Sequence, residues 1–148
     1  MPEKETIRRA RQDKREGKAP STQAGEFVRE EIEHIREGKH GARNTKQAIA
    51  IGLQKARRAG VKLPPPKKGE ASEETRQSAK RALKRSGMKP SAKRSSAMEK
   101  ALKREPRKAA SKKALSRQAH SAAKKRSASE RSASAKKAAR TRARRRVA

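Results

Sequence analysis

Four side chains that could bind an anion lie within eight residues of one another. They are Lys39, His40, Arg43 and Lys46. Three are permanently positive, and the histidine is positive only when it is protonated. A predicted helix begins directly after them, at Asn44 or Thr45, and its first backbone amides carry the positive end of the helix dipole. Cations grouped around a helix N-terminus suit a phosphate, so this segment predicts a local phosphate site.

The loop before this helix reads Gly38-Lys39-His40-Gly41, which has two interpretations. KH domains use a GXXG loop between two helices to clamp a nucleic-acid backbone. A KH domain also needs a three-stranded sheet, and this chain offers no strand candidate of useful length. In the second interpretation Gly38 ends one helix and Gly41 eases the turn to the next. The residues alone leave both interpretations open.

No constellation typical of an enzyme is present. Cysteine is absent, and the three histidines, His34, His40 and His120, do not form an HExxH motif. Paired-cysteine and P-loop spacings are also absent. We therefore expect no catalytic residue, no metal ligand, no cofactor and no small-molecule substrate. The single aromatic residue, Phe27, belongs to an apolar stripe, which excludes base stacking on an aromatic platform.

The first element that positions the loop is a predicted helix over residues 23–37. Its apolar residues recur with helical spacing and share an arc of roughly 140°; they are Ala24, Phe27, Val28, Ile32 and Ile35. Ser21 or Thr22 is the expected N-cap, and Gly38 the expected end. Glu31 interrupts the stripe, so it lies either on an open flank or beside a cation from another element.

The second element is a predicted helix over residues 46–59. Asn44 followed by Gln47 resembles a capping box. The middle of its apolar face is small, at Ala48, Gly52 and Ala56, so a partner helix could approach closely. Residues 21–60 therefore predict a helical hairpin. Because its core is small for an independent unit, self-association through the hairpin is a further expectation.

Charge, apolar periodicity and proline content together divide the chain into four segments. The 148 residues include 45 Lys and Arg against 15 Asp and Glu, a formal net charge of +30. Residues 1–60 carry +6 of this charge, and residues 61–148 carry +24. The predicted domains are a charged N-terminal helix or arm (1–20), the hairpin (21–60), a proline-rich linker (61–70) and a basic low-complexity tail (71–148). The expected fold class is mostly α, with a short helical hairpin and a long, largely disordered basic tail.

The tail contains local helix signals that its charge opposes. A helix is indicated from Ser72 to Gly87, and Ser96 with Glu99 matches a capping box before a helix that Pro106 stops. Like charges four residues apart disfavour these helices in water. We therefore expect nascent helices that form on a polyanion.

The cations of the tail are expected to contact phosphates rather than to read sequence. The candidate nucleic-acid-binding residues, besides the four of the loop, are Lys80, Arg81, Lys84, Arg85, Lys103, Arg104, Lys112, Lys113, Lys124, Lys125, Arg126, Arg142, Arg144, Arg145 and Arg146.

Two resemblances accompany these patterns. The segment from Glu3 to Gly60, through APSTQAGEFVREEIEHIREGKHGAR and KQAIAIGLQKARRAG, resembles a small bacterial domain family of unknown function, which implies no site. The tail, through KPSAK at 89–93 and AASKKA at 109–114, is similar in composition to the tails of linker histones and of bacterial linker-histone-like proteins. That similarity implies association with DNA.

The sequence therefore predicts a non-sequence-specific DNA-binding protein of the nucleoid-associated or histone-like kind, with duplex DNA as its partner. The first alternative is an RNA- or ribosome-associated basic protein. The second is a protein-interaction hairpin with a tail that only localises it. The longest apolar run, residues 48–53, is too short to cross a bilayer, so no transmembrane segment is expected. The expected location is cytoplasmic and nucleoid-associated, or nuclear in a eukaryote.

Overall fold

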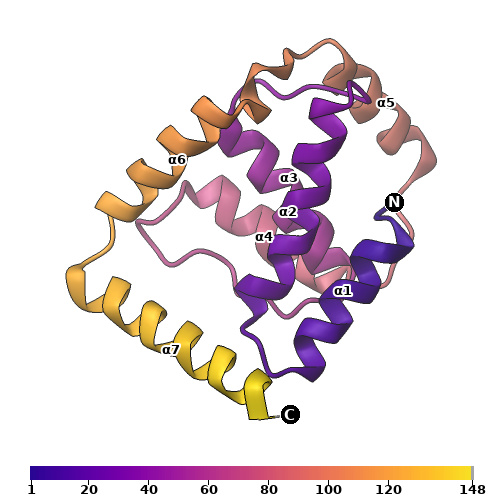
Figure 1. The fold of residues 1–148 in the computed structure, drawn as a ribbon. Coiled ribbons are helices and arrows are strands. Elements are labelled where there is room, and N and C mark those ends of the chain that lie inside the picture. The colour runs from indigo at the N-terminus through magenta and orange to yellow at the C-terminus, as the bar shows by residue number, and fades with distance from the viewer. Residues whose placement is uncertain (148) are drawn as a thin grey trace. The chain divides into compact units, whose positions relative to one another are not determined.

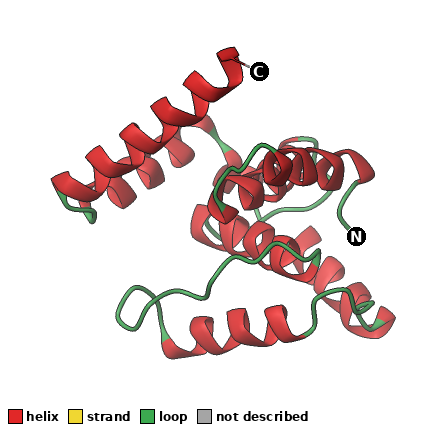
Figure 2. Ribbon diagram, turned by 90° about the horizontal axis from the view of Figure 1, so that it is seen from below, coloured by secondary structure: helices red, strands yellow, loops and turns green. Residues whose placement is uncertain are grey.

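The computed structural model describes residues 1–147, and their regular structure is helical (Figures 1 and 2). Within these residues, seven α-helices and one 3-10 helix follow one another: α1 (Lys4–Arg15), α2 (Pro20–Arg36), α3 (Thr45–Arg58), α4 (Glu73–Lys84), α5 (Ala92–Lys103), η1 (Arg107–Ala110), α6 (Lys112–Lys124) and α7 (Ala128–Val147). The chain divides into two compact units, one over Met1–Ser111 and one that begins at Lys112. The helical character that the sequence predicts is confirmed.

Helix α2 begins and ends at residues that favour those positions. Pro20 occupies the first helical turn after the N-cap Ala19, so the expected N-cap at Ser21 or Thr22 is wrong. Proline suits this position because its fixed φ is helical and its missing N–H would have no partner there. At the other end, Gly38 has a φ of +80°, and the Lys39 amide donates to the His34 carbonyl at 3.0 Å. This is a Schellman C-cap, as the first glycine of the GXXG loop would provide.

Helix α3 is capped as the sequence predicts. The Asn44 side chain accepts a hydrogen bond from the Gln47 amide at 2.8 Å, and the Gln47 side chain accepts one from the Arg43 amide at 2.7 Å. Helices α2 and α3 pack side by side in the first unit (Figure 1). A Cβ added at Gly52 would lie 2.6 Å from the Val28 Cα, so the small face of α3 does bring the two backbones close together.

The core of the first unit is built mainly from α1, α2 and α3. Phe27 is 1% exposed, and it clusters with Ala10, Ala24, Ala56 and Val61. Ala10 comes from α1, and its neighbour Ile7 packs against the same cluster. The charged N-terminal segment is therefore a docked helix.

The proline-rich segment after α3 is held against the hairpin. The buried Arg57 guanidinium donates to the carbonyls of Leu63 at 3.2 Å and Pro64 at 3.1 Å. Desolvation by burial lowers the pKa of Arg57. Val61 is buried and Leu63 packs on the core cluster, so this segment contributes to the unit it leaves.

The expected long, largely disordered tail is wrong. Helix α4 contacts α3 and buries Ala79 and Ala82, and the Gly87 amide donates to the Arg58 carbonyl at 2.9 Å. Further along, η1 contacts both α2 and α3 and buries Ala109 and Ala110. Residues up to 111 thus return to the hairpin and form part of its unit.

Residues 71–111 form helices because helix propensity and the burial of alanines outweigh the repulsion between like charges. Repulsion between like charges four residues apart costs only a few tenths of a kcal/mol for each pair. Alanine, lysine and arginine are among the best helix formers, and small alanines can be buried by close approach. Ser72 caps α4 as predicted, because its hydroxyl accepts from the Thr75 amide at 3.2 Å. The predicted capping box at Ser96 is wrong, since α5 begins earlier, after Ser91.

The second unit consists of α6, α7 and the turn between them. Ser127 and Glu130 form a reciprocal capping box at the start of α7: the Ser127 amide donates to the Glu130 carboxylate at 2.9 Å, and the Glu130 amide donates to the Ser127 hydroxyl at 3.2 Å. Arg126 donates to the Glu130 carbonyl at 3.0 Å, and Arg131 donates to the Ala123 carbonyl at 3.2 Å. These bonds define where α6 ends and α7 begins.

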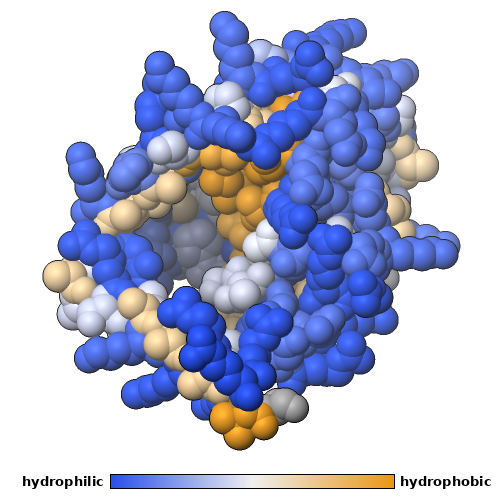
Figure 3. All heavy atoms as spheres, viewed as in Figure 1, coloured by the Kyte–Doolittle hydropathy of each residue, from blue (hydrophilic) through white to orange (hydrophobic). Residues whose placement is uncertain are grey.

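The two helices of the second unit bury no side chain within the described residues. Hydrophilic side chains cover most of the face that Figure 3 presents. Among residues 1–147, no helix combines the length and the apolar character that a membrane crossing requires.

Candidate nucleic-acid interface

Helix α7 concentrates positive charge around its whole circumference. Its 20 residues extend over about 30 Å. Eight cations stand on it: Arg131, Lys136, Lys137, Arg140, Arg142, Arg144, Arg145 and Arg146. At 100° per residue they leave no arc wider than roughly 80° without a positive side chain. A helix of this kind has no apolar face to place on protein, and none of its described side chains is buried.

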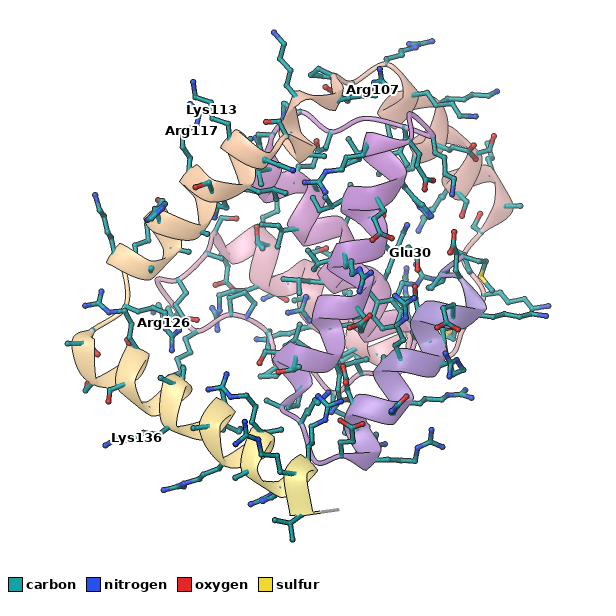
Figure 4. The ribbon with its side chains drawn as sticks, in the orientation of Figure 1. Glu30, Arg107, Lys113, Arg117, Arg126 and Lys136 are labelled. Carbon is teal, nitrogen blue, oxygen red and sulfur yellow. The ribbon has the colours of Figure 1, made fainter. Side chains whose placement is uncertain are left out.

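Helix α6 carries its charge differently. It has four Lys and Arg residues and no carboxylate, and Lys113, Arg117 and Lys124 share one face by helical spacing. Figure 4 shows Lys113 and Arg117 extending from α6, and Lys136 extending from α7. From Lys112 onward the chain contains fourteen Lys and Arg residues against one acidic residue, Glu130.

The predicted cations of α4 and α5 are exposed but belong to the first unit. Lys80, Arg81, Lys84 and Arg85 lie on or just after α4. Of the pair at the end of α5, Lys103 lies 2.8 Å from the Glu99 carboxylate. The hydrogen bond from Lys103 lowers the pKa of Glu99, which keeps this carboxylate ionised beside the lysine. The predicted cations of the second unit, from Lys112 to Arg146, are exposed as well.

The four loop residues of the predicted phosphate site have different surroundings. Lys39 lies 2.9 Å from Glu37 and 3.5 Å from Glu3, and its hydrogen bond with Glu37 raises the pKa of Lys39. The His40 side chain is only 12% exposed and faces Glu31. Arg43 and Lys46 are exposed at the start of α3. Of the four side chains, Arg43 and Lys46 are therefore the two that are exposed and form no ion pair with a carboxylate of the described residues.

The backbone of the GXXG loop is engaged by the chain itself. The Gly41 amide donates to the Leu102 carbonyl at 2.8 Å, and the Ala42 amide donates to the Pro106 carbonyl at 3.1 Å. A Cβ at Gly41 would lie 1.9 Å from the Glu105 carbonyl oxygen. Gly41 is therefore required for the close approach of residues 102–106.

A second cationic surface lies on α1, where the sequence predicted a charged N-terminal helix or arm and no binding residues. Lys4, Arg8, Arg11 and Arg15 are exposed and fall within an arc of roughly 60° at helical spacing. Arg8 is bound to Glu5 at 2.7 Å, and the Arg8 hydrogen bond is the main reason that the pKa of Glu5 falls to about 2. The spacing of four, three and four residues was visible in the sequence.

Five further cations of the second unit lie on the same helices as the predicted nucleic-acid-binding residues, although the sequence did not single them out. They are Arg117, Arg131, Lys136, Lys137 and Arg140. The signal that could have found them is continuity: α7 runs without a glycine or proline from Ala128 to Val147. Once this helix is recognised, its cations form one surface.

Comparison with known proteins gives a family match over part of the chain. The model of a family of unknown function, DUF6496, matches residues 17–68. This match extends from the end of α1 to the proline-rich segment after α3, and it includes both helices of the hairpin. Comparisons with curated proteins and with solved structures returned no match. The match does not reach residues 71–148, and none of the comparisons relates those residues to linker histones.

Proposed function

We propose that this protein binds duplex DNA without sequence preference, through the phosphate backbone. The observation that carries the proposal is α7, whose eight cations surround a helix about 30 Å long with no buried side chain. A helix in the major groove has phosphates on both sides, so cations around its circumference can all contribute. Continuous basic helices of other DNA-binding proteins dock in this way.

The choice of duplex DNA over duplex RNA rests on groove geometry. The major groove of B-form DNA is wide enough to admit an α-helix, whereas that of A-form RNA is deep and narrow. The absence of any aromatic residue other than Phe27, which is buried, argues against binding single strands by stacking. An architectural, histone-like role in a nucleoid is the function that this kind of contact supports.

Two charge-matched variants of the full chain test the proposal. In the first, Arg142, Arg144, Arg145 and Arg146 of α7 are replaced by Gln. In the second, the four cations of the α1 surface, Lys4, Arg8, Arg11 and Arg15, are replaced by Gln. Both variants lose four positive charges. The binding constant for a 30-base-pair duplex is measured by fluorescence anisotropy over a range of salt concentrations, with duplex RNA in parallel.

The α7 variant is expected to bind duplex DNA at least about tenfold more weakly, because each lost phosphate contact no longer releases counterions. Its slope of log K against log salt should flatten by about 3 to 4. The α1 variant should show a much smaller change. Equal losses in the two variants would mean that diffuse charge, not α7, carries binding. Equal or tighter binding of duplex RNA by the unaltered chain would favour the RNA-associated alternative.

A further inference from the structure

A carboxylate and two imidazoles converge at the C-terminal end of α2. Glu31 and His34 belong to α2, and His40 belongs to the loop after it. One potential ligand atom from each lies within 4.8 Å of the others. Glu31 is 0% exposed, and the side chains of His34 and His40 are 14% and 12% exposed. Glu31 and His34 are three residues apart and therefore share one face of α2. The loop after α2 brings His40 to the same place.

The hydrogen bonds of His40 direct an unprotonated nitrogen at Glu31. His40 Nδ1 lies 3.0 Å from the Gly41 carbonyl oxygen, and because a carbonyl can only accept, Nδ1 carries a proton. His40 Nε2 lies 3.1 Å from Glu31 Oε1. This buried oxygen nevertheless has no partner with hydrogen-bond geometry. In neutral His40 a lone pair therefore faces a carboxylate oxygen, an arrangement that needs a cation between the two atoms.

The hydrogen bonds of His34 and Lys55 leave His34 Nδ1 and Glu31 Oε1 available to a ligand. His34 Nε2 lies 2.9 Å from Glu3 Oε1, and an ionised carboxylate only accepts, so Nδ1 of neutral His34 keeps its lone pair. Lys55 Nζ lies 2.6 Å from Glu31 Oε2 and thus occupies the other oxygen of that carboxylate. Lys39, which also lies 3.5 Å from Glu3, is on the solvent side.

We propose that Glu31, His34 and His40 bind one divalent transition-metal ion of the Zn²⁺ type. Two imidazoles and one carboxylate are a donor set that such ions favour. Donors that share an ion at about 2.1 Å lie at most roughly 4.2 Å apart, so small rotations of the two imidazoles complete the site. The Gly41 carbonyl and Glu3 supply the outer hydrogen bonds that orient metal-bound histidines.

The ion would join three parts of the first unit. Glu3 precedes α1, and Glu31 and His34 lie on α2. His40 lies in the loop after α2, directly before the Gly41 and Ala42 amides that donate to Leu102 and Pro106. A bound ion therefore braces the contact between the N-terminus, the hairpin and the segment after α5. The competing occupant is a proton, which would make His40 an imidazolium paired with Glu31.

The test measures Zn²⁺ binding to the full chain by competition with a chromophoric chelator, and Co²⁺ binding by its visible absorption. Because the chain carries a net charge of +30, weak unspecific binding of cations is disfavoured. We expect one ion per chain, a higher melting temperature with Zn²⁺, and the absorption of Co²⁺ with nitrogen and oxygen ligands. His34→Gln and His40→Gln should each weaken Zn²⁺ binding at least about tenfold.

The third histidine provides the matched control. His120 is exposed on α6, and His120→Gln should leave the stoichiometry and affinity unchanged. Circular dichroism establishes whether each variant keeps its helices. The absence of stoichiometric Zn²⁺ binding by the unaltered chain, with no shift of its melting temperature, would overturn the proposal and assign the site to the proton. An equal loss of affinity in His120→Gln would overturn it as well.

Discussion

At the scale of single residues, Glu31 takes part both in the packing of α2 on α3 and in the cluster with His34 and His40. Its charge interrupts the apolar stripe of α2, and the structure resolves the two possibilities that the sequence left open. Glu31 is completely buried, and its charge is compensated by Lys55 of α3 at 2.6 Å. A buried carboxylate without a partner is costly, so this ion pair restricts how α2 and α3 can be aligned.

Replacing Lys55 by Met should therefore destabilise the first unit. Removal of one partner from a buried pair costs roughly 3–5 kcal/mol, and because Lys55 is itself 27% exposed and His40 remains nearby, we expect about 2 kcal/mol. Urea unfolding followed by circular dichroism measures the change. Lys46→Met, at an exposed position on the same helix, is the control. Equal stability of both variants would show that the Glu31–Lys55 pair is not important for the fold.

At the scale of elements, the contact between α2 and α3 depends on a glycine. The Gly52 backbone approaches Val28 so closely that any side chain at position 52 must displace α2. Ala48 and Ala56, on the same face of α3, are 0% exposed. The hairpin is thus held by the close backbone contact at Gly52 and by the buried Phe27, which clusters with Ala56 of α3.

Gly52→Val should destabilise the protein by about 3 kcal/mol, because overpacking forces the two helices apart. The comparison variant is Gly25→Ala, in the middle of α2 at a position where an added Cβ meets nothing within 4 Å. That variant should be stabilised by about 0.5–1 kcal/mol, since glycine weakens a helix interior. Thermal and urea unfolding measure both. A tolerated valine at position 52 would contradict the close packing of α2 and α3.

At the scale of the whole molecule, the chain has two units of different character. The first closes only when residues 107–110 return to the hairpin, where the Thr45 hydroxyl donates to the Ala109 carbonyl at 2.7 Å and Arg36 donates to the Ala110 carbonyl at 2.9 Å. The second is a pair of exposed cationic helices. A well-packed unit followed by a basic one is compatible with the proposed binding of DNA through α7.

Ala110→Asp tests whether the first unit includes its last segment. Ala110 is 1% exposed, so Ala110→Asp buries a carboxylate in a site packed for a methyl group, and η1 should detach even though Arg36 lies nearby. Hydrogen exchange of the Gly41 and Ala42 amides, which donate to Leu102 and Pro106, should then become at least about tenfold faster. Ala101→Asp, an exposed substitution on α5 with the same change of charge, should leave exchange unaltered. Unchanged exchange in both variants would mean that the segment is not docked.

The sequence by itself determined the local features of the chain. Asn44 and Gln47 specify the start of α3, Ser72 specifies the start of α4, and Gly38 ends α2 as a left-handed residue. These features depend on side chains within four residues of the backbone groups that they satisfy. The apolar periodicity of residues 23–37 and 46–59 likewise predicts the two helices that pack together.

Only the tertiary structure decided what lies beside the hairpin. Neither the charge of residues 71–111 nor their short alanine runs indicate a surface on which they could dock, because a buried alanine cannot be distinguished from an exposed one by pattern. The meeting of Glu31, His34 and His40 escaped prediction for the same reason. Glu31 and His34 share a helical face by spacing, but His40 reaches them only through the turn at Gly38 and the support of residues 102–106. Such contacts arise from packing between distant segments, which local sequence does not encode.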